Sequence, residues 1–274
     1  MKEAQLKKVL SKVKENDFAV PEEIGVEEIT KKMLEYIGST DPVLRDHLIY
    51  VTFYHWILQG KYTDEQLLKL AQAAIDEEHL HYGLGEKGTD SVFTRTFSSL
   101  LSAVILYANR ERHFLSRVQF DVMKEALFHY LKEENDMRGF VPEKGWAHGI
   151  AHAADALEEL PHFEYLAEED LEILLNLARD KMVTNDHVFI CLEDERMSNA
   201  VVTSFKHENL SEENAFAWLD SFNEIEKGLD WTEDRVAIHN LKLFLKSLYF
   251  KTIKEDMLPK SYEEKIKEVI LKTR

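Results

Sequence analysis

Three polar residues stand at helical spacing near the middle of the chain. His148, His152 and Asp155 occur in the segment GWAHGIAHAADAL, at offsets i, i+4 and i+7, which places them within about 60° of one helical face. Two imidazoles one turn apart can bind the same metal ion, and a histidine bonded to a carboxylate can act as a general base near neutral pH. The pattern therefore predicts a polar, ligand-binding pocket, and we expect Trp146 to form one of its walls.

A metal centre is the sharpest interpretation of these residues. His148 and His152 would be two ligands of a divalent ion, Zn²⁺ or Mn²⁺, and a metal-dependent hydrolase would be the matching activity. Asp155 lies about 10 Å along the helix axis from His148, so we expect it to fix the tautomer of His152 and not to bind the same ion. Further ligands would come from residues near other helix starts, namely Asp136, His187 and Glu193.

A structural interpretation of the same residues leads to a different function. Both histidines are then satisfied interior side chains, and Asp155 is bonded to an arginine or a tryptophan N–H of a neighbouring helix. The protein would bind a protein or peptide partner, or a small ligand, and its acidity would favour a basic partner. Neither Ser198 nor Cys191 lies in a nucleophile motif, so a serine or cysteine hydrolase is disfavoured.

The helices that carry these residues form a repeat. Helical hairpins recur, and their second helices open at spacings of 50, 51, 50 and 39 residues, at Arg45, Arg95, Trp146, Arg196 and Arg235. A two-helix repeat of this length is typical of armadillo or HEAT solenoids. We predict an all-α solenoid of about five hairpins that forms one domain over residues 1–274. Residues 1–25 would be an N-terminal cap, 26–253 the hairpins and 254–274 a C-terminal cap helix; the alternative is a helical bundle without repeats.

The alignment of these hairpins shows where the central one departs from the others. Six residues after each opening stand Val51, Leu101, His152, Val202 and Leu241, and nine residues after stand Tyr54, Val104, Asp155, Phe205 and Phe244. Only the central hairpin places polar groups at these two core positions. Its helix is also rich in glycine and alanine, which either permits close helix packing or leaves a void; beside three polar side chains we expect the void.

No segment has sustained strand alternation, so we expect no sheet. Capping residues mark the boundaries of the predicted helices. Gly38 is expected to be a left-handed C-terminal cap. N-caps are expected at Asp41 (followed by Pro42), Thr63, Asp90, Ser211, Thr232 and Ser261, the last forming a capping box with Glu264.

Charge and composition narrow the class of partner. The 34 basic and 51 acidic residues give a formal charge of −17, which repels nucleic acid and anionic membranes. No apolar run approaches the roughly 20 residues of a membrane helix, and the N-terminus lacks a signal-peptide core. The single cysteine, Cys191, excludes an internal disulfide and suits a reducing cytosol, so we expect a cytoplasmic protein.

Several strings of the sequence resemble a known family. TDPVLRD, YANRER, DMRGFVPEKGWAHGIAHAAD and EDERM are similar to an uncharacterised bacterial family, domain of unknown function 2785, over nearly the whole chain. This resemblance implies a bacterial, cytosolic, all-helical protein and carries no catalytic roles. Separately, LEYIGSTDPVLRD resembles a HEAT repeat, which implies that its aspartate and arginine connect neighbouring turns.

Overall fold

Nearly all regular structure in the computed structural model, which describes residues 1–273, is helical. The predicted all-α class is therefore confirmed. The chain divides into two compact units, residues 1–152 and 153–274, and the boundary falls inside helix α8 (Gly149–Glu159). The expectation of one continuous solenoid domain therefore stays a prediction.

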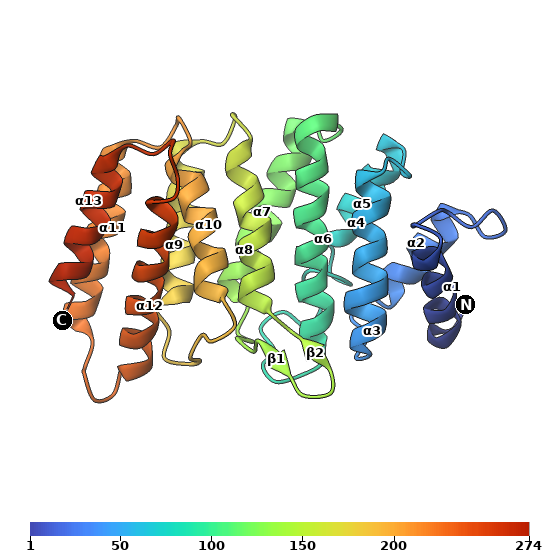
Figure 1. Ribbon diagram of the computed structural model, residues 1–274, viewed down its shortest axis with the longest axis horizontal. Helices are drawn as coiled ribbons and strands as arrows, with labels where there is room; N and C mark the ends of the chain where they lie inside the picture. Colours follow the sequence, from blue (N-terminus) through green and yellow to red (C-terminus); the bar gives the residue numbers. More distant parts are fainter. Residues whose placement is uncertain (274) are drawn as a thin grey trace. The chain divides into compact units, whose positions relative to one another are not determined.

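The first unit contains helices that run alongside one another and are connected at their ends (Figure 1). They are followed by one short β-hairpin, and the elements are α1 (Glu3–Glu15), α2 (Val26–Glu35), α3 (Pro42–Leu44), the π-helix η1 (Arg45–Tyr50), α4 (Val51–Leu58), α5 (Asp64–Ala74), α6 (Ser91–Arg112), α7 (Arg117–Glu133), β1 (Phe140–Val141) and β2 (Gly145–Trp146). Helices α4 and α5 both pack against α6.

Two N-caps of this unit are formed as the sequence predicted. The Asp41 carboxylate accepts hydrogen bonds from the Val43 and Leu44 N–H groups, and Pro42 occupies the first position of α3. Thr63 caps α5 through a capping box with Gln66. Asp90 stands at the N-cap of α6 but makes no capping bond; its carboxylate instead accepts from Lys144 Nζ at 2.7 Å.

Two features of the first unit differ from what the sequence predicts. The antiparallel pair β1–β2 contradicts the expectation of no sheet; it is too short, at two residues a strand, to show alternation. Gly38 is not in the left-handed region. A Cβ at Gly38 would lie 1.9 Å from Thr94 Oγ1 and 2.8 Å from the Thr94 nitrogen, so this glycine is needed for close packing on α6.

Helix α6 is the buried centre of the first unit. Over 22 residues it is long and apolar enough to span a membrane by length and composition, and 83% of its apolar window is buried inside the protein. No uninterrupted apolar run marks this helix in the sequence, because serines and threonines divide it. Core helices of soluble proteins pass the same test, so this observation is weak support for a membrane span.

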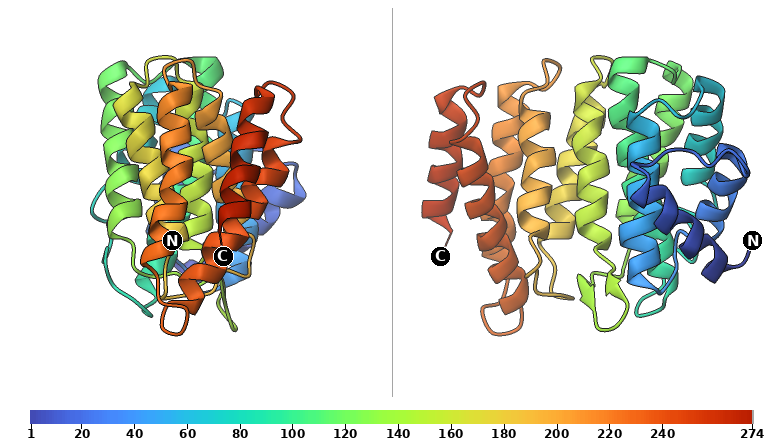
Figure 2. Two further views of the ribbon diagram at one scale, coloured as in Figure 1. Left: turned by 90° about the vertical axis from the view of Figure 1, so that its left-hand side faces the viewer. Right: turned by 45° about the vertical axis from the view of Figure 1, so that its right-hand side comes forward.

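The second unit is a set of packed helices (Figure 2). Its elements after α8 are the 3₁₀ turn η2 (Leu160–His162), α9 (Glu168–Met182), α10 (Glu193–Phe205), α11 (Glu212–Gly228), α12 (Arg235–Thr252) and α13 (Lys260–Lys272). Helix α10 packs against α9 and α12, and α13 against α11 and α12. Together these helices form the apolar core of the unit.

The predicted caps of the second unit are only partly formed. Ser211 caps α11 by accepting from the Asn214 N–H. The predictions at Thr232 and Ser261 are wrong, because α12 starts after Asp234 and α13 after Pro259. Ser261 lies inside α13 and donates to Glu212, a partner on another helix that local spacing does not show.

Core positions in the aligned hairpins agree with expectation at one offset. Six residues after the openings, Leu101, His152, Val202 and Leu241 are all buried, and only Val51 of the first hairpin is half-buried. At the ninth position Tyr54 is 42% exposed, whereas the sequence placed it in the core. The π-helix η1 is the physical reason, since it interrupts the α-helical phase between Arg45 and Tyr54.

Candidate functional site

The β1–β2 hairpin lies on the start of α3 and η1, and a glycine permits this contact. Gly145 has φ +79°, and a Cβ there would lie 2.7 Å from Pro42 Cβ and 3.1 Å from a guanidinium nitrogen of Arg45. No other residue type fits both the backbone conformation and the space. The hairpin and α3 are accordingly found at the same end of this unit in Figure 1.

Arg45 is fully buried, and its side chain binds the backbone of the hairpin. Its guanidinium donates to the carbonyl oxygens of Ser39 at 2.6 Å, Lys144 at 2.7 Å and Trp146 at 3.3 Å. Its Nε lies 2.8 Å from the Asp46 carboxylate. Burial raises the pKa of Asp46, although Arg45 and the Trp146 N–H oppose that rise. The first residues of η1 therefore fix the backbone on which Trp146 stands.

Four rings form a cluster where the hairpin leads into α8. The Trp146 indole stacks on the His148 imidazole with centroids 4.2 Å apart, and His148 contacts His152 edge-on at 5.6 Å. His152 contacts Phe97 of α6 at 5.0 Å. Three of the four residues predicted to bind a ligand thus come together in the first unit. They do so through ring contacts, which the sequence analysis did not predict.

The cluster continues in both directions as one unbroken series of ring contacts. Phe97 contacts Tyr50 at 6.4 Å, Tyr50 contacts Tyr54 at 6.5 Å, Tyr54 contacts His55 at 5.5 Å and His55 stacks on Phe18 at 3.8 Å. At the other end, Trp146 meets Phe140 across the hairpin at 5.0 Å. We call these nine residues the aromatic row: Phe18, His55, Tyr54, Tyr50, Phe97, His152, His148, Trp146 and Phe140.

The row is buried in the middle and open toward both ends. Phe97 and His152 are buried, while Tyr54, Trp146 and Phe140 are 42%, 40% and 56% exposed. The four remaining rings are half-buried. Half-exposed rings held by neighbouring rings lose little conformational freedom when they contact a partner, so such surfaces are suited to binding.

Backbone strain is concentrated along this row. Five non-glycine residues of the first unit have positive φ, and four of them belong to the row or adjoin it: Asp17, Phe18, Glu143 and His148. Each costs of order 1 kcal/mol or more in this conformation, and such residues cluster at functional sites. His148 keeps its conformation because its N–H donates to the Arg138 carbonyl at 3.0 Å. The strain supports a role for the row beyond packing.

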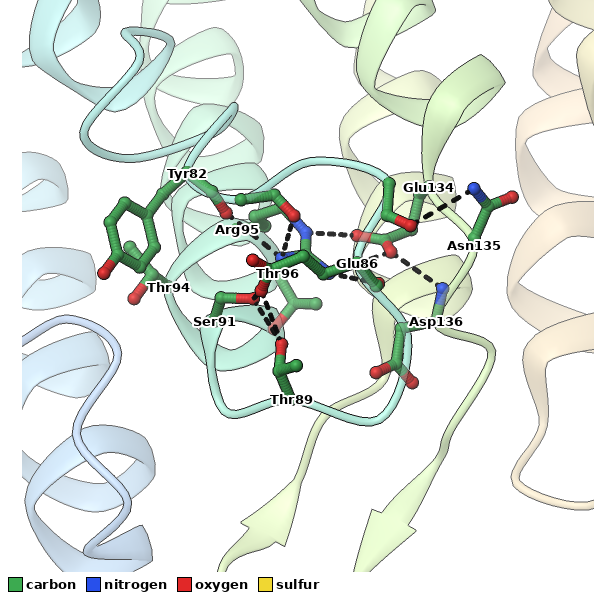
Figure 3. A network of polar contacts seen from close by, with 12 residues as sticks. Tyr82, Glu86, Thr89, Ser91, Thr94, Arg95, Thr96, Glu134, Asn135 and Asp136 are labelled. Atoms are coloured by element: carbon green, nitrogen blue, oxygen red, sulfur yellow. Dashed lines mark hydrogen bonds and ion pairs between the residues drawn. The ribbon is translucent and has the colours of Figure 1, made fainter.

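A buried polar network anchors the long segment between α5 and α6 (Figure 3). Arg95 is fully buried and pairs with Glu134, at 2.7 and 3.0 Å, and it donates to the carbonyl oxygens of Tyr82, Gly83 and Glu86. The Glu134 carboxylate also accepts from the Asp136 N–H at 2.8 Å. These contacts account for both charges, so the network is structural.

Asp136, a predicted metal ligand, belongs to this anchor. Its carboxylate accepts from the Gly88 N–H at 2.9 Å and from Arg138 at 2.6 to 3.0 Å. Burial would raise the pKa of Asp136, but the bonds from Arg138 and Gly88 outweigh it and lower the pKa. A carboxylate committed to an arginine in this way is poorly suited to bind a metal ion.

The predicted site residues of the second unit have partners of their own. Both Asp155 carboxylate oxygens accept from Arg196 of α10, so the structural interpretation placed this residue correctly against an arginine. Glu193 is buried and accepts from the Cys191 N–H at 2.8 Å. The His187 carbonyl accepts from Asn240 at 2.8 Å, and its ring contacts Phe189. Their role as ligands stays a prediction.

The glycine at the start of α8 does not adjoin a void. A Cβ at Gly149 would lie 3.0 Å from the Asp136 carbonyl oxygen and 3.5 Å from the Thr96 side chain. Close packing, the alternative that the sequence analysis set aside, is what the structure has at this position. The accessible feature of the site is therefore the ring surface.

Most of the aromatic row has no signal in the sequence. Tyr50 and Tyr54 are one helical turn apart, and Phe140 and Trp146 flank the hairpin turn, but no pattern connects these pairs to each other or to Phe18. The connection is made by Phe97 of α6, which the sequence presents as an ordinary core residue.

Comparison with known proteins confirms the resemblance found in the sequence. A family model described as "Protein of unknown function (DUF2785)" matches residues 80–250, which is more than half of the chain. The match includes the hairpin and α8, whereas Phe18, Tyr50, Tyr54 and His55 precede it. No curated protein and no solved structure matches the chain.

Proposed function

We propose that this chain, which belongs to the DUF2785 family, is an α-solenoid binding protein whose aromatic row holds an extended peptide segment of a protein partner. The observation that carries the proposal is the continuous row of nine rings, joined by eight ring contacts, with strained backbone at its ends. Binding takes place in the cytoplasm and involves neither nucleic acid nor a membrane. The row serves recognition, and no chemical step is assigned to it.

Side-chain bonds between turns support the solenoid architecture. Four aspartates lie at or next to the start of a helix that opens a repeat, and each accepts a hydrogen bond from a residue about one repeat away within its own unit. These pairs are Asp41 with Lys7, Asp90 with Lys144, Asp194 with Ser247 and Asp234 with Asn185. Sequence separations of 34 to 54 residues for these pairs are what stacked two-helix repeats produce. The resemblance to a HEAT repeat implies ties of this kind, although here the arginines have other partners.

The row fits a peptide better than a small molecule. The ring-to-ring steps from Tyr54 to Trp146 total about 28 Å at most, which an extended segment of about nine residues covers at 3.3 Å per residue. A partner can place side chains on both exposed ends and lie across the buried middle. Exposed tyrosine and tryptophan are the residue types enriched in binding hot spots.

A peptide-display selection tests this proposal. A random twelve-residue library is selected on the wild-type protein, on Tyr54→Ser/Trp146→Ser, and on Tyr107→Ser/Trp231→Ser, a control whose rings are similarly exposed, at 49% and 47%, and lie outside the row. We expect peptides enriched on the wild type to bind the control variant and to lose binding to the row variant. Circular dichroism and thermal melts check that both variants fold. If no enriched peptide depends on the row, the proposed function is wrong.

A metal-dependent hydrolase is the second candidate, and one observation favours it. The imidazole centroids of His148 and His152 are 5.6 Å apart with rings at 86°, and two imidazoles on one tetrahedral Zn²⁺ have centroids about 5 Å apart, given a Zn–N distance of about 2 Å. Elemental analysis of protein purified without a histidine tag tests it. Stoichiometric Zn or Mn that is lost in His148→Ala/His152→Ala would support a metal centre. Absence of metal, with no thermal shift on adding either ion, would exclude it.

A further inference from the structure

We infer that the segment held by the aromatic row is cationic, with arginine or lysine side chains stacked on the exposed faces of Trp146 and Tyr54. This inference rests on the proposed function and names the chemistry of the partner. Its basis is the electrostatics of the rings and of the residues beside them. The face of an aromatic ring is electron-rich, and tryptophan binds a cation most strongly.

The first unit already uses this interaction inside the row. The Arg45 guanidinium carbon lies 4.8 Å from the centroid of Phe97, a ring of the row, and 4.2 Å from that of Phe93. Arg45 is fully buried, so its charge is balanced by Asp46, the carbonyl oxygens and the two ring faces. A guanidinium is therefore compatible with the row at its least hydrated point, and the exposed rings can bind one at lower cost in desolvation.

Acidic residues stand at both ends of the row. Asp17 directly precedes Phe18, and Glu143 lies in the hairpin turn between Phe140 and Trp146; both are exposed. Both also have positive φ, 49° and 64°. No lysine or arginine belongs to the row, whose three histidines carry no charge when unprotonated, and Lys144 of the hairpin is already paired with Asp90.

The charge of the unit acts in the same direction. Residues 1–152 contain 19 basic and 24 acidic residues, a net charge of −5, within a chain of net charge −17. This field attracts a cationic segment from a distance and repels an anionic one. The rings then supply the short-range contact with the bound segment. Substitution of a ring should therefore lower the affinity, and added salt should weaken the long-range electrostatic attraction.

Fluorescence anisotropy with defined decapeptides tests the inference. The labelled probes are (Gly-Arg)₅, (Gly-Gln)₅ and (Gly-Glu)₅, and the proteins are the wild type, Trp146→Leu, Trp146→Phe, Tyr54→Leu and the matched control Trp231→Leu. We expect (Gly-Arg)₅ to bind at least about tenfold more tightly than (Gly-Gln)₅, and (Gly-Glu)₅ not to bind. A desolvated cation–π contact corresponds to about a 5- to 30-fold loss in Trp146→Leu, with a smaller loss in Trp146→Phe.

The control separates a specific contact from general attraction to an acidic protein. Trp231→Leu should change the affinity less than about twofold, because this residue lies in the second unit and outside the row. Equal losses in Trp146→Leu and Trp231→Leu, or equal binding of the Arg and Gln peptides, would overturn the inference. Tighter binding of a ten-residue oligothymidylate than of (Gly-Arg)₅ would overturn it too. Display peptides that depend on the row but lack arginine and lysine would refute only the cationic partner and leave the proposed function intact.

Discussion

The contact between the hairpin and α3 predicts an unusually large effect for one glycine-to-alanine substitution. In Gly145→Ala the new methyl group would lie 2.7 Å from Pro42 Cβ and 3.2 Å from Asp46 Oδ2, at φ +79°. The left-handed backbone costs roughly 1–2 kcal/mol in a residue with a Cβ, and forced overpacking costs roughly 1–3 kcal/mol more. The expected loss in the free energy of unfolding is therefore about 2–5 kcal/mol, a large part of a typical total of about 5–15 kcal/mol.

Gly60→Ala is the matched control for this substitution. Gly60 lies in the same unit with φ +67°, but nothing is within 4 Å of its Cβ position, so only the backbone cost of roughly 1–2 kcal/mol applies. Urea unfolding of both variants, followed by circular dichroism, measures the difference, which we expect to be about 1–3 kcal/mol. Equal destabilisation by the two substitutions would mean that the hairpin is not held against Pro42 and Asp46.

Three further predictions concern the anchor and the row. Arg95→Met should lower the free energy of unfolding in urea by about 3–5 kcal/mol, because Glu134 is left buried without its counter-charge, and Arg95→Met/Glu134→Leu should recover part of this loss. An interaction energy below about 0.5 kcal/mol between the two residues in a double-mutant cycle would contradict this prediction. The lowered pKa of Asp136 gives stability that is present above its usual pKa of about 3.9 and lost as pH falls through its lower folded-state value. The stability difference between the wild type and Asp136→Asn should therefore be full at pH 6 and shrink below about pH 4; a constant difference across that range refutes the assignment. His152→Leu should change the unfolding free energy by less than about 1 kcal/mol, since it restores an apolar side chain at a buried position, yet it should weaken peptide binding, as the ring contact to Phe97 is lost; unchanged binding in the anisotropy assay would remove His152 from the row's function.

Local patterns in the sequence correctly predicted the features of the fold that depend on residues close together in the chain. The helical class and the caps at Asp41, Thr63 and Ser211 follow from spacing within one turn, and the structure has them. The burial of His152 followed from comparing hairpins, because equivalent positions face the same core. The cap at Ser261 failed, since its hydroxyl bonds to Glu212, 49 residues away.

The rest of the site depends on contacts that no local pattern shows. Tyr54 was expected in the core because the offset from Arg45 assumed continuous α-helix, and the π-helical segment turns it by roughly a quarter turn to the surface. The hairpin alignment predicts a helix that opens at Trp146, but Trp146 lies in β2, where Gly145 and Arg45 fix it, and α8 begins at Gly149. A change of helix type determines the position of Tyr54, and contacts with residues about 100 positions earlier in the chain determine that of Trp146.

The π-helix η1 also makes the chain length adjustable beside the site. Its hydrogen bonds close from i to i+5, so it contains one residue more per turn than the α-helices that flank it. Loss of one exposed residue, such as His47, would leave an ordinary α-helical turn with Arg45 and Tyr50 still one turn apart. Relatives shortened by one residue between Leu44 and Val51 should therefore retain both the arginine that binds the hairpin and the tyrosine that contacts α6. Insertions or deletions should be tolerated here more readily than at Gly145.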